Sequence, residues 1–258
     1  HKKKKFKHVF IDLSKKRNIQ AALAEAQPDI VVHMAAITHI DNCEIDRKKG
    51  KNGIVWKINV EGTREIAKLC AKNDIPLIFL STECVFDGKK EFFHENDKKK
   101  PINWYGVTKS EAEEVIFNSG AKFTVIRSVV AYHKDDEEKT IYGKILKEIK
   151  TKSKIFMVDD QLFTPTYTYD IVKAIHKAID KNIRGVLHVA PSKNITPYAF
   201  AVLVLSKNKL SEKSVEKTNL KKLYGSEKAS LRLKNSSLFS EQSSKLLKFK
   251  AKSPERAL

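Results

Sequence analysis

The chain has 258 residues, 41% of them apolar, and a formal net charge of +19. A chain of this length and apolar content can bury a substantial core, in one domain or in a large and a small one, which indicates a globular protein. Lysine supplies most of the charge, because only 7 of the 50 basic residues are arginine. Nucleic-acid readers usually rely on arginine forks and interleaved aromatic side chains. The scattered lysines therefore favour a solvated surface over a nucleic-acid site, with attraction of an anionic ligand as the alternative.

The cysteines and the apolar segments indicate where the protein resides. Cys43, Cys70 and Cys84 form no CxxC pair and are odd in number, which fits a reducing compartment better than a disulfide framework. No apolar stretch approaches the roughly 20 residues that span a membrane, and the N-terminal lysine run precedes no apolar signal core. The sequence therefore predicts a cytoplasmic protein without a membrane partner.

Apolar runs alternate with amphipathic segments along most of the chain. The unbroken apolar run at residues 30–36 is typical of a strand buried on both faces, and an apolar stripe along 55–71 predicts a helix. This alternation predicts an α/β fold with a doubly wound parallel sheet. In chain order, strands are expected at residues 7–12, 30–36, 76–80, 123–130, 155–158 and 185–189, and helices at 18–26, 55–71, 141–150 and 169–181.

The pattern changes in the last quarter of the chain. From about Thr196 it becomes helical and polar, and it ends in a segment rich in Lys and Ser. We therefore expect a large domain over residues 1–150. Residues 151–258 are expected to form mainly a smaller lobe, with some segments returning to the large sheet.

Candidate catalytic side chains follow the third expected strand. Ser81 and Thr82 come directly after that strand, and Tyr105 and Lys109 come later, at the start of a helix-forming segment. Residues four apart share a helix face, so the ammonium of Lys109 can lie close to the phenol of Tyr105. A nearby cation favours phenolate and lowers the pKa of a tyrosine. Tyr105 would then be a usable acid near neutral pH, with Ser81 or Thr82 holding a substrate carbonyl.

Short motifs lie in a fixed order along the chain, and together they resemble a known family. They are Ala35-Ala36, residues 59–63, Ser81-Thr82, residues 85–88, 105–109, 160–161 and 165–167. In this order they resemble the extended short-chain dehydrogenases/reductases. The run at residues 81–88, with 158–161 and 165–167, more narrowly resembles the dTDP-4-dehydrorhamnose reductase branch. The resemblance implies a Rossmann-type dinucleotide-binding domain over 1–150, a substrate-binding lobe within 151–258, and NAD(P)H-dependent reduction of a 4-keto sugar nucleotide.

The resemblance also implies roles for individual residues. Tyr105 would be the general acid, Lys109 its pKa-lowering partner and a ligand of the cofactor ribose, and Thr82 the hydroxyl that orients the substrate. No metal is implied, and a homodimer is allowed. The cofactor, NADP or NAD, would further contact Asp12, Leu13, Ala35, Ala36, Asn59 and Ser128. The nucleotide-sugar substrate would contact Glu83, Val85, Phe86, Gln161 and Arg232.

Simpler interpretations stay open for several residues. Tyr105 could be an ordinary buried tyrosine, Asn59 a cross-link between helices, and Asp12 a turn residue at the end of a strand. His33 lies in an apolar run and is expected to be a core histidine. The polar cluster at residues 39–44 matches no tetrahedral zinc spacing, so loop polarity explains it.

The glycine-rich turn that receives pyrophosphate on this fold has no counterpart in the sequence. The chain has nine glycines, and the first is Gly50. In the sheet order 3-2-1-4-5-6 the strand before that turn is central, so its loss should expose two long unpaired edges inside a core. We therefore expect that this chain lacks an N-terminal segment of the functional protein, which would also carry the residue that distinguishes NADH from NADPH.

Departures from the family pattern leave the substrate open. Cys84 stands where the reductase branch usually has an aromatic residue, and Val129 and Val130 stand where it tends to have tryptophan. Leu233 replaces a proline. Two other functions share these stretches. The regulatory subunit of methionine adenosyltransferase acts by binding a catalytic partner, and a nucleotide-sugar epimerase or dehydratase would hold an oxidised cofactor without net consumption of NAD(P)H.

Overall fold

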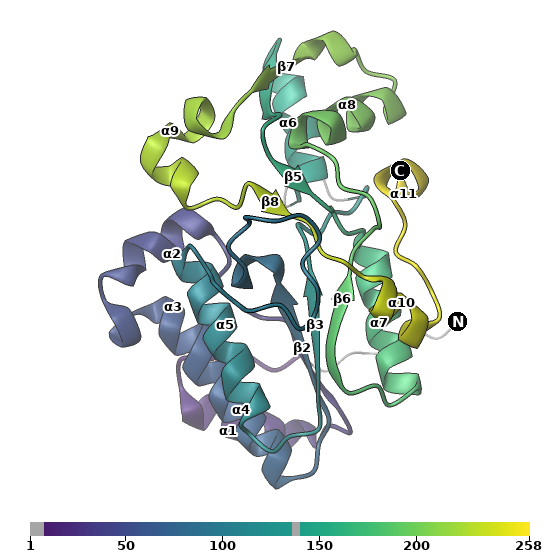
Figure 1. Cartoon of the computed structure of the whole chain (residues 1–258). Helices are drawn as coiled ribbons and strands as arrows, with labels where there is room; N and C mark the ends of the chain where they lie inside the picture. Colours follow the sequence, from purple (N-terminus) through teal and green to yellow (C-terminus); the bar gives the residue numbers. More distant parts are fainter. Residues whose placement is uncertain (1–7, 136–139) are drawn as a thin grey trace.

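Four parallel strands form the main sheet of the computed structural model, which describes residues 8–135 and 140–258. Their spatial order is β1-β2-β3-β6 (Figure 1). The strands are β1 (Val31–His33), β2 (Leu77–Thr82), β3 (Phe123–Ser128) and β6 (Gly185–Val189). Parallel strands need crossover connections, which helices supply here, so the predicted α/β class is confirmed.

Helices cover both faces of this sheet. Successive side chains of a strand point to opposite faces, so an unbroken apolar strand has apolar side chains to bury on each face. Leu77 and Phe79 of β2 pack into an apolar cluster on one face, and Ile78 packs into another cluster on the opposite face. The unbroken apolar run of β2 is therefore buried on both sides. The first face carries α1 (Lys16–Ala26), α4 (Thr63–Lys72) and α5 (Trp104–Phe117), and the second carries α7 (Thr168–Asp180) and α10 (Glu241–Leu247).

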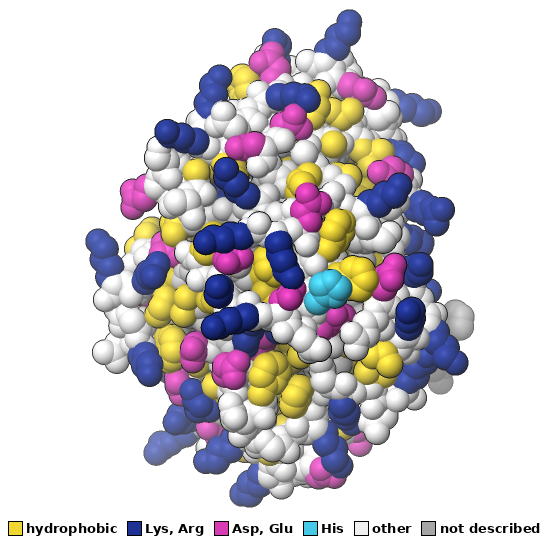
Figure 2. All heavy atoms as spheres, in the orientation of Figure 1, with side chains coloured by type: hydrophobic (Ala, Val, Ile, Leu, Met, Phe, Trp, Pro, Cys, Tyr) yellow, Lys and Arg dark blue, Asp and Glu magenta, His cyan; other side chains and the backbone are white. Residues whose placement is uncertain are grey.

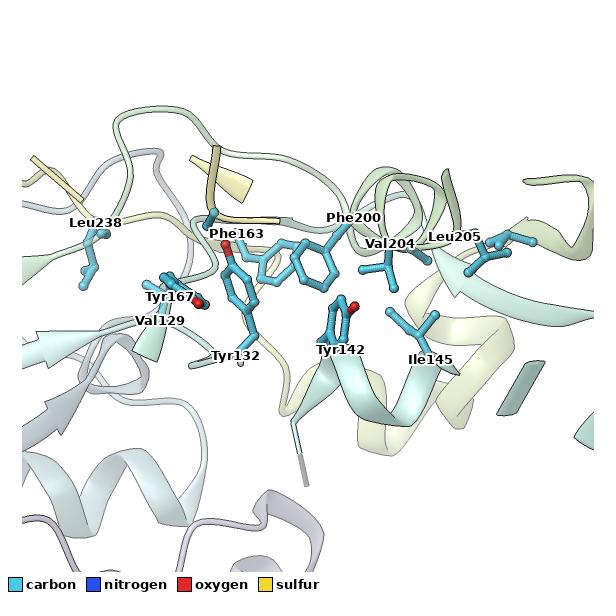
Figure 3. Close-up of a cluster of buried hydrophobic side chains, with 14 of the residues drawn as sticks. Val129, Tyr132, Tyr142, Ile145, Phe163, Tyr167, Phe200, Val204, Leu205 and Leu238 are labelled. Carbon is cyan, nitrogen blue, oxygen red and sulfur yellow. The ribbon is translucent and has the colours of Figure 1, made fainter. Parts of the chain in front are cut away.

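A smaller lobe lies above the sheet in the view of Figure 1. Its core is aromatic: Phe200 meets Tyr132 with 5.1 Å between ring centres and Phe163 with 6.0 Å (Figure 3). Tyr142, from before residue 150, packs in the same core, and the boundary at residue 150 stays a prediction. The elements of the lobe are the parallel pairs β4 (Ile155–Val158) with β7 (Val215–Thr218) and β5 (Leu162–Phe163) with β8 (Asn235–Ser236), and helices α6 (Ile141–Thr151), α8 (Pro197–Lys207), α9 (Leu220–Ser230) and α11 (Pro254–Ala257).

The N-terminal part differs from expectation in two ways. Residues 8–12 form no strand, and Lys7 lies outside the described residues. The expected strand at 30–36 shortens to β1, which pairs with residues 77–79 and ends the sheet. Within the described residues, the sheet therefore ends at one short edge strand, β1. The expectation that two long unpaired edges would be exposed inside a core is wrong. Phe10 remains 88% exposed, since no described strand pairs with its segment.

The helix expected at residues 55–71 is nearly continuous but changes its winding. It consists of α3 (Ile54–Trp56), a π-helical turn (Lys57–Gly62) and α4, and it follows an unpredicted helix, α2 (Ile40–Arg47). A Cβ on Gly62 would lie 2.8 Å from the Leu13 carbonyl oxygen, so a glycine is needed for the chain before α1 to approach this closely. π-helical turns are often found at functional sites, and this one carries Asn59.

The face of the molecule seen in Figure 2 carries both basic and acidic side chains. Figure 2 shows Lys and Arg side chains spread over the visible face with acidic side chains between them, which agrees with a solvated surface. None of the helices in the two described ranges is both long and apolar enough to cross a membrane.

Helix α5 begins at a cap that also joins the two lobes. The Asn103 side chain accepts a hydrogen bond from the Gly106 amide (2.7 Å) and donates one to the Leu231 carbonyl of the smaller lobe (2.9 Å). A Cβ on Gly106 would lie 2.1 Å from the Cys84 carbonyl oxygen. Glycine therefore allows the first turn of α5 to lie directly against the loop that follows β2.

Replacing Asn103 with alanine should destabilise the protein, because it removes the cap and takes a donor from the Leu231 carbonyl. We expect the free energy of unfolding, measured in urea, to fall by about 1–3 kcal/mol. Asn219→Ala is the matched control, since Asn219 caps α9 through the Lys222 amide (2.7 Å) but is exposed; it should cost less. Equal losses in the two variants would contradict the second role of Asn103.

Candidate active site

The side chains predicted to carry the chemistry meet at the carboxyl ends of β1, β2 and β3. They line a cavity of about 340 Å³, whose walls include Ala36, Thr82, Tyr105, Lys109 and Ser128. Ligands of open parallel sheets bind outside the carboxyl ends of the strands. The structure therefore brings these five residues together at the place where a ligand is expected on this fold.

Tyr105 is half-buried in the first turn of α5. Burial raises the pKa of Tyr105 well above its usual value, the negative forms of Cys84 and Glu83 raise it further, and a hydrogen bond with Thr82 acts in the opposite direction. The prediction that Lys109 lowers this pKa is wrong for this structure. Tyr105 keeps its proton at neutral pH and is available as a proton donor.

Lys109 faces the sheet. Its Nζ donates a hydrogen bond to the Leu80 carbonyl (2.7 Å) and lies 3.8 Å from the centre of the Phe79 ring. Burial lowers the pKa of Lys109 to about 7, against the opposing effect of Glu113. Ammonium and neutral amine are therefore both populated near neutral pH.

Glu83 places a buried carboxyl group beside Thr82. The Thr82 hydroxyl donates to Glu83 Oε2 (2.8 Å), and the Cys84 thiol lies 3.7 Å from Oε1. Burial raises the pKa of Glu83 to about 7, although the Thr82 hydrogen bond opposes this change. Glu83 thus changes charge in the same pH range as Lys109.

A second cavity of about 180 Å³ adjoins the first, because Glu83 and Cys84 line both. Its other walls include Gln161, Tyr224 and Arg232 of the smaller lobe. Three of the five residues predicted to contact substrate, Glu83, Gln161 and Arg232, therefore line this second cavity. The first cavity lies at the strand ends of the main sheet, and the second extends from it to the smaller lobe.

Arg232 and Gln161, the two predicted substrate residues in the smaller lobe, are both fixed by hydrogen bonds to neighbouring groups. Arg232 Nη2 donates to the two carboxylate oxygens of Asp41 (3.0 and 3.2 Å), and its guanidinium lies 3.9 Å from the centre of the Tyr224 ring. Gln161 Nε2 donates to the Leu233 carbonyl (2.7 Å). Because Asp41 belongs to α2 of the large domain, the pair with Arg232 bridges the two lobes.

Other predicted site residues line neither cavity. Val85 and Phe86 are fully buried, and Phe86 stacks on Phe93 with 4.4 Å between ring centres. Their predicted substrate contacts are therefore corrected: both are core residues, because the loop after β2 turns their side chains into the smaller lobe. The complete set outside the two cavities is Asp12, Leu13, Ala35, Asn59, Val85 and Phe86.

Three residues follow the simpler interpretations of the sequence. The Asn59 side chain bonds to the amide and carbonyl of Ile37 (2.8 and 2.9 Å) and to the Thr108 hydroxyl (3.0 Å), so it cross-links the loop after β1 to α5. Asp12 accepts hydrogen bonds from the amide and hydroxyl of Ser14 (3.0 and 2.6 Å) in a turn. His33 is a core histidine, and burial lowers its pKa to about 3.

Sequence reasoning missed Thr38, Val130 and Tyr224, which also line the cavities. Thr38 and Val130 follow β1 and β3, so the rule that strand ends form the site could have found them. Val130 has a φ of +28°, which β-branched residues rarely adopt. Tyr224 lies on a polar helix late in the chain, and its sequence context gives no signal.

No cluster of three or more potential metal-binding His, Cys, Asp and Glu side chains occurs in residues 8–135 and 140–258. The polar side chains at residues 39–44 bond to the protein itself. His39 accepts a hydrogen bond from the Asn42 amide (3.4 Å), and Glu44 accepts one from the Trp104 amide.

Several known proteins have sequences similar to this chain. The family model described as RmlD substrate binding domain matches residues 4–258. A dTDP-4-dehydrorhamnose reductase of Sinorhizobium fredii is 29% identical over 203 residues, which are 76% of this chain and 66% of that protein. The spore coat polysaccharide biosynthesis protein SpsK of Bacillus subtilis is 29% identical over 201 residues, covering 78% of this chain and 68% of that protein. The chain thus spans about two thirds of the length of these relatives.

Solved structures show the same architecture. A dTDP-4-dehydrorhamnose reductase from Bacillus anthracis, in complex with NADP, superposes with a TM-score of 0.86 at 25% identity, covering 96% of this chain and 84% of that chain. The dTDP-glucose 4,6-dehydratase DesIV from Streptomyces venezuelae shares the fold, with a TM-score of 0.76 at 15% identity over 95% of this chain and 76% of that chain. Since the family model covers nearly the whole sequence, the chain belongs to the RmlD substrate binding domain family.

Proposed function

We propose that this chain reduces the keto group of a nucleotide-linked 4-keto sugar with NADPH or NADH, as a dTDP-4-dehydrorhamnose reductase does. The observation that carries the proposal is the meeting of Thr82, Tyr105 and Lys109 at one cavity at the carboxyl ends of parallel strands. The similar proteins include a dTDP-4-dehydrorhamnose reductase and a dTDP-4-keto-6-deoxy-D-glucose reductase. Cys43, Cys70 and Cys84 are all free and buried, which supports a cytoplasmic location.

Tyr105 supplies the proton in this reaction. Its raised pKa keeps the phenol protonated at neutral pH. An alkoxide that forms on a reduced carbonyl is a stronger base than an ordinary phenolate, so it can accept the proton of Tyr105. The Thr82 hydroxyl lines the same cavity and orients the carbonyl oxygen toward the phenol.

The cavity residues fit the nicotinamide end of NADP or NAD. Tyr105, Lys109 and Ser128 offer hydrogen-bond donors for ribose hydroxyls, and Ala36 is small enough for a planar ring to approach the strand end. When bound, a reduced nicotinamide supplies the hydride that the carbonyl carbon receives. The described residues include no glycine-rich turn for the pyrophosphate, so the assignment covers the nicotinamide end alone.

The second cavity suits the nucleotide part of the substrate. Arg232, which pairs with Asp41 in this structure, can exchange that partner for phosphate oxygens, and Tyr224 offers a base the ring face that Arg232 does not cover. Because Glu83 and Cys84 line both cavities, a sugar bound between them would reach Tyr105 while its nucleotide stays in the smaller lobe.

Glu83 controls the direction of the Thr82 hydroxyl. When Glu83 is ionised, its carboxylate accepts the Thr82 proton across 2.8 Å, and Thr82 has no proton to offer a carbonyl. When Glu83 is protonated, its carboxyl group can donate to the Thr82 oxygen instead. The Thr82 proton is then free to point into the cavity, so the reduction is favoured below the pKa of Glu83, which is about 7.

Tyr105→Phe should abolish the oxidation of NADPH or NADH with dTDP-4-dehydrorhamnose. Loss of a general acid lowers kcat by about 10²–10⁴-fold, and the removal of one hydroxyl should leave the fold intact. The measurement is the decrease in absorbance of the reduced cofactor, with the thermal unfolding midpoint as the check on folding.

The matched control is Tyr169→Phe, which removes the hydroxyl of an exposed tyrosine outside both cavities and should retain activity. Equal activity of Tyr105→Phe and wild type would overturn the role of Tyr105. Sugar isomerisation or dehydration without net cofactor consumption would identify an epimerase or dehydratase. An inactive protein that co-purifies with methionine adenosyltransferase would identify the regulatory function.

The dependence of kcat/KM on pH should show the ionisation of Glu83. Glu83 and Lys109 both lose a proton as the pH rises through about 7. The proposed reaction uses the carboxylic acid of Glu83 to free the Thr82 proton, and the ammonium of Lys109, with three donors, to hold the anionic cofactor. The logarithm of kcat/KM for wild type should therefore fall with a limiting slope near −2 above this pH. Glu83→Gln cannot ionise, and its amide can still donate to Thr82, so its slope should approach −1. Identical slopes in the two proteins would refute this role of Glu83.

A further inference from the structure

Helix α5 carries a third charged residue on the face that meets the sheet. Tyr105, Lys109 and Glu113 follow one another at four-residue spacing, so they form one stripe along the helix. Tyr105 and Lys109 line the cavity, whereas Glu113 has no exposed surface. The proton transfer described above gives Glu113 no role.

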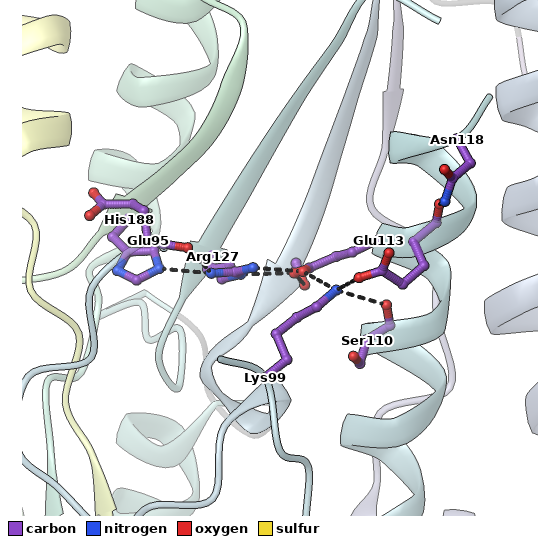
Figure 4. A network of polar contacts seen from close by, with 9 residues as sticks. Glu95, Lys99, Ser110, Glu113, Asn118, Arg127 and His188 are labelled. Atoms are coloured by element: carbon purple, nitrogen blue, oxygen red, sulfur yellow. Dashed lines mark hydrogen bonds and ion pairs between the residues drawn. The ribbon is translucent and has the colours of Figure 1, made fainter. Parts of the chain in front are cut away.

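Glu113 is held as a carboxylate by surrounding donors. Arg127 of β3 donates from Nε to Oε1 (2.9 Å) and from Nη2 to Oε2 (2.7 Å), as Figure 4 shows. Ser81 donates to Oε1 (2.6 Å), and Lys99 Nζ lies 3.1 Å from Oε2. Burial alone would raise the pKa of Glu113, but the hydrogen bonds and charges of Arg127 and Lys99 lower it below its usual value. The carboxylate is therefore charged at neutral pH despite its burial.

The groups around Arg127 secure this pair from the other side. Arg127 Nη1 donates to the Glu95 carbonyl (3.0 Å) and lies 3.3 Å from Nε2 of His188 on β6 (Figure 4). Burial lowers the pKa of His188, so its ring is neutral and adds no second cation. A buried ion pair persists only when its polar atoms are satisfied, and here they are.

The charge of Glu113 acts on Lys109. Burial lowers the pKa of Lys109, and the charge of Glu113 raises it. Glu83 also lines the cavity with Lys109, and burial raises its pKa to about 7, so it is partly charged at neutral pH. Five further described groups near Lys109 carry no charge at neutral pH. They are His33 of β1, Phe79 and the Leu80 carbonyl of β2, Ser128 of β3, and Tyr105 of α5 itself.

We propose that Glu113 is a positioning residue that favours the ammonium form of Lys109 and holds the Tyr105–Lys109 face of α5 against β2. The proposal rests on the proposed function, since it concerns the same site. Without the carboxylate, burial alone acts on Lys109, and the neutral amine dominates at pH 7. A residue that only fixed the helix in place would change stability and leave the protonation of Lys109 as it is.

The test is the titration of Lys109 itself, followed by NMR on protein labelled with ¹³C and ¹⁵N in lysine. The Lys109 signal is assigned by its loss in Lys109→Arg. In wild type we expect a transition near pH 7, apart from the lysines that titrate at their usual pKa of about 10.4. Glu113→Gln should lower this transition by about one pH unit or more. Glu114→Gln is the control, because Glu114 also pairs with Lys99 (2.8 Å) but is half-exposed, and it should leave the transition unchanged.

Glu113→Gln leaves Arg127 buried without its carboxylate, so a second variant guards against misfolding. The double variant Glu113→Gln with Arg127→Met removes both buried charges and should show the same lowered transition. A Lys109 transition that stays near pH 7 in either folded variant would overturn the proposal. Because this titration needs neither cofactor nor substrate, it tests the effect of Glu113 on Lys109 even if the protein turns out not to be a reductase.

Discussion

The packing of helix α5 against strand β2 is the contact on which the site depends. Three devices along the helix fix it: the Asn103 cap at its start, the glycine contact between Gly106 and the Cys84 carbonyl, and the buried pair of Glu113 with Arg127 two turns later. Each joins α5 to a different part of the structure. Because they act at separate points, the helix can neither slide nor rotate without breaking at least one of them, and Tyr105 stays beside Thr82.

The site combines one group that does not titrate near neutral pH with two that do. Tyr105 keeps its proton, while Glu83 and Lys109 both have a pKa of about 7. As the pH rises through that value, the cavity changes from one positive charge to one negative charge. Nucleotide cofactors and nucleotide sugars are anions, so the cavity attracts them on the acidic side of this transition and repels them on the basic side.

Apolar periodicity was enough to predict most of the regular elements. The strands at residues 155–158 and 185–189 have the expected bounds, and α1, α6 and α7 differ from expectation by one or two residues at either end. The segment at 8–12 has the apolar residues of a strand but no described partner, and pairing with a neighbour cannot be read from a local pattern. Residues 39–44 are mostly polar and were interpreted as a loop, so the sequence pattern did not predict helix α2.

The candidate site was predictable where it follows a rule about strand ends or helix spacing. Thr82, Tyr105 and Lys109 meet as expected. The direction of the pKa of Tyr105 was not predictable, because it depends on how deeply the phenol is buried and on where the Lys109 ammonium points. Val85 and Phe86 adjoin Glu83 in sequence, yet the turn after β2 sends them into the core. Contacts made across the fold, such as Glu113 with Arg127, are invisible in either segment alone.

The bridge between Asp41 and Arg232 has a consequence for how the two lobes respond to dissolved ions. Its side chains are 24% and 13% exposed, and the neighbouring Lys228 is 57% exposed, whereas Glu113 and Arg127 are 0% and 3% exposed. Mobile ions screen charges they can approach and hardly affect buried ones. Rising ionic strength therefore weakens the Asp41–Arg232 bridge between the lobes more than the Glu113–Arg127 pair, so salt acts on the contact between the lobes and leaves the position of α5 unchanged.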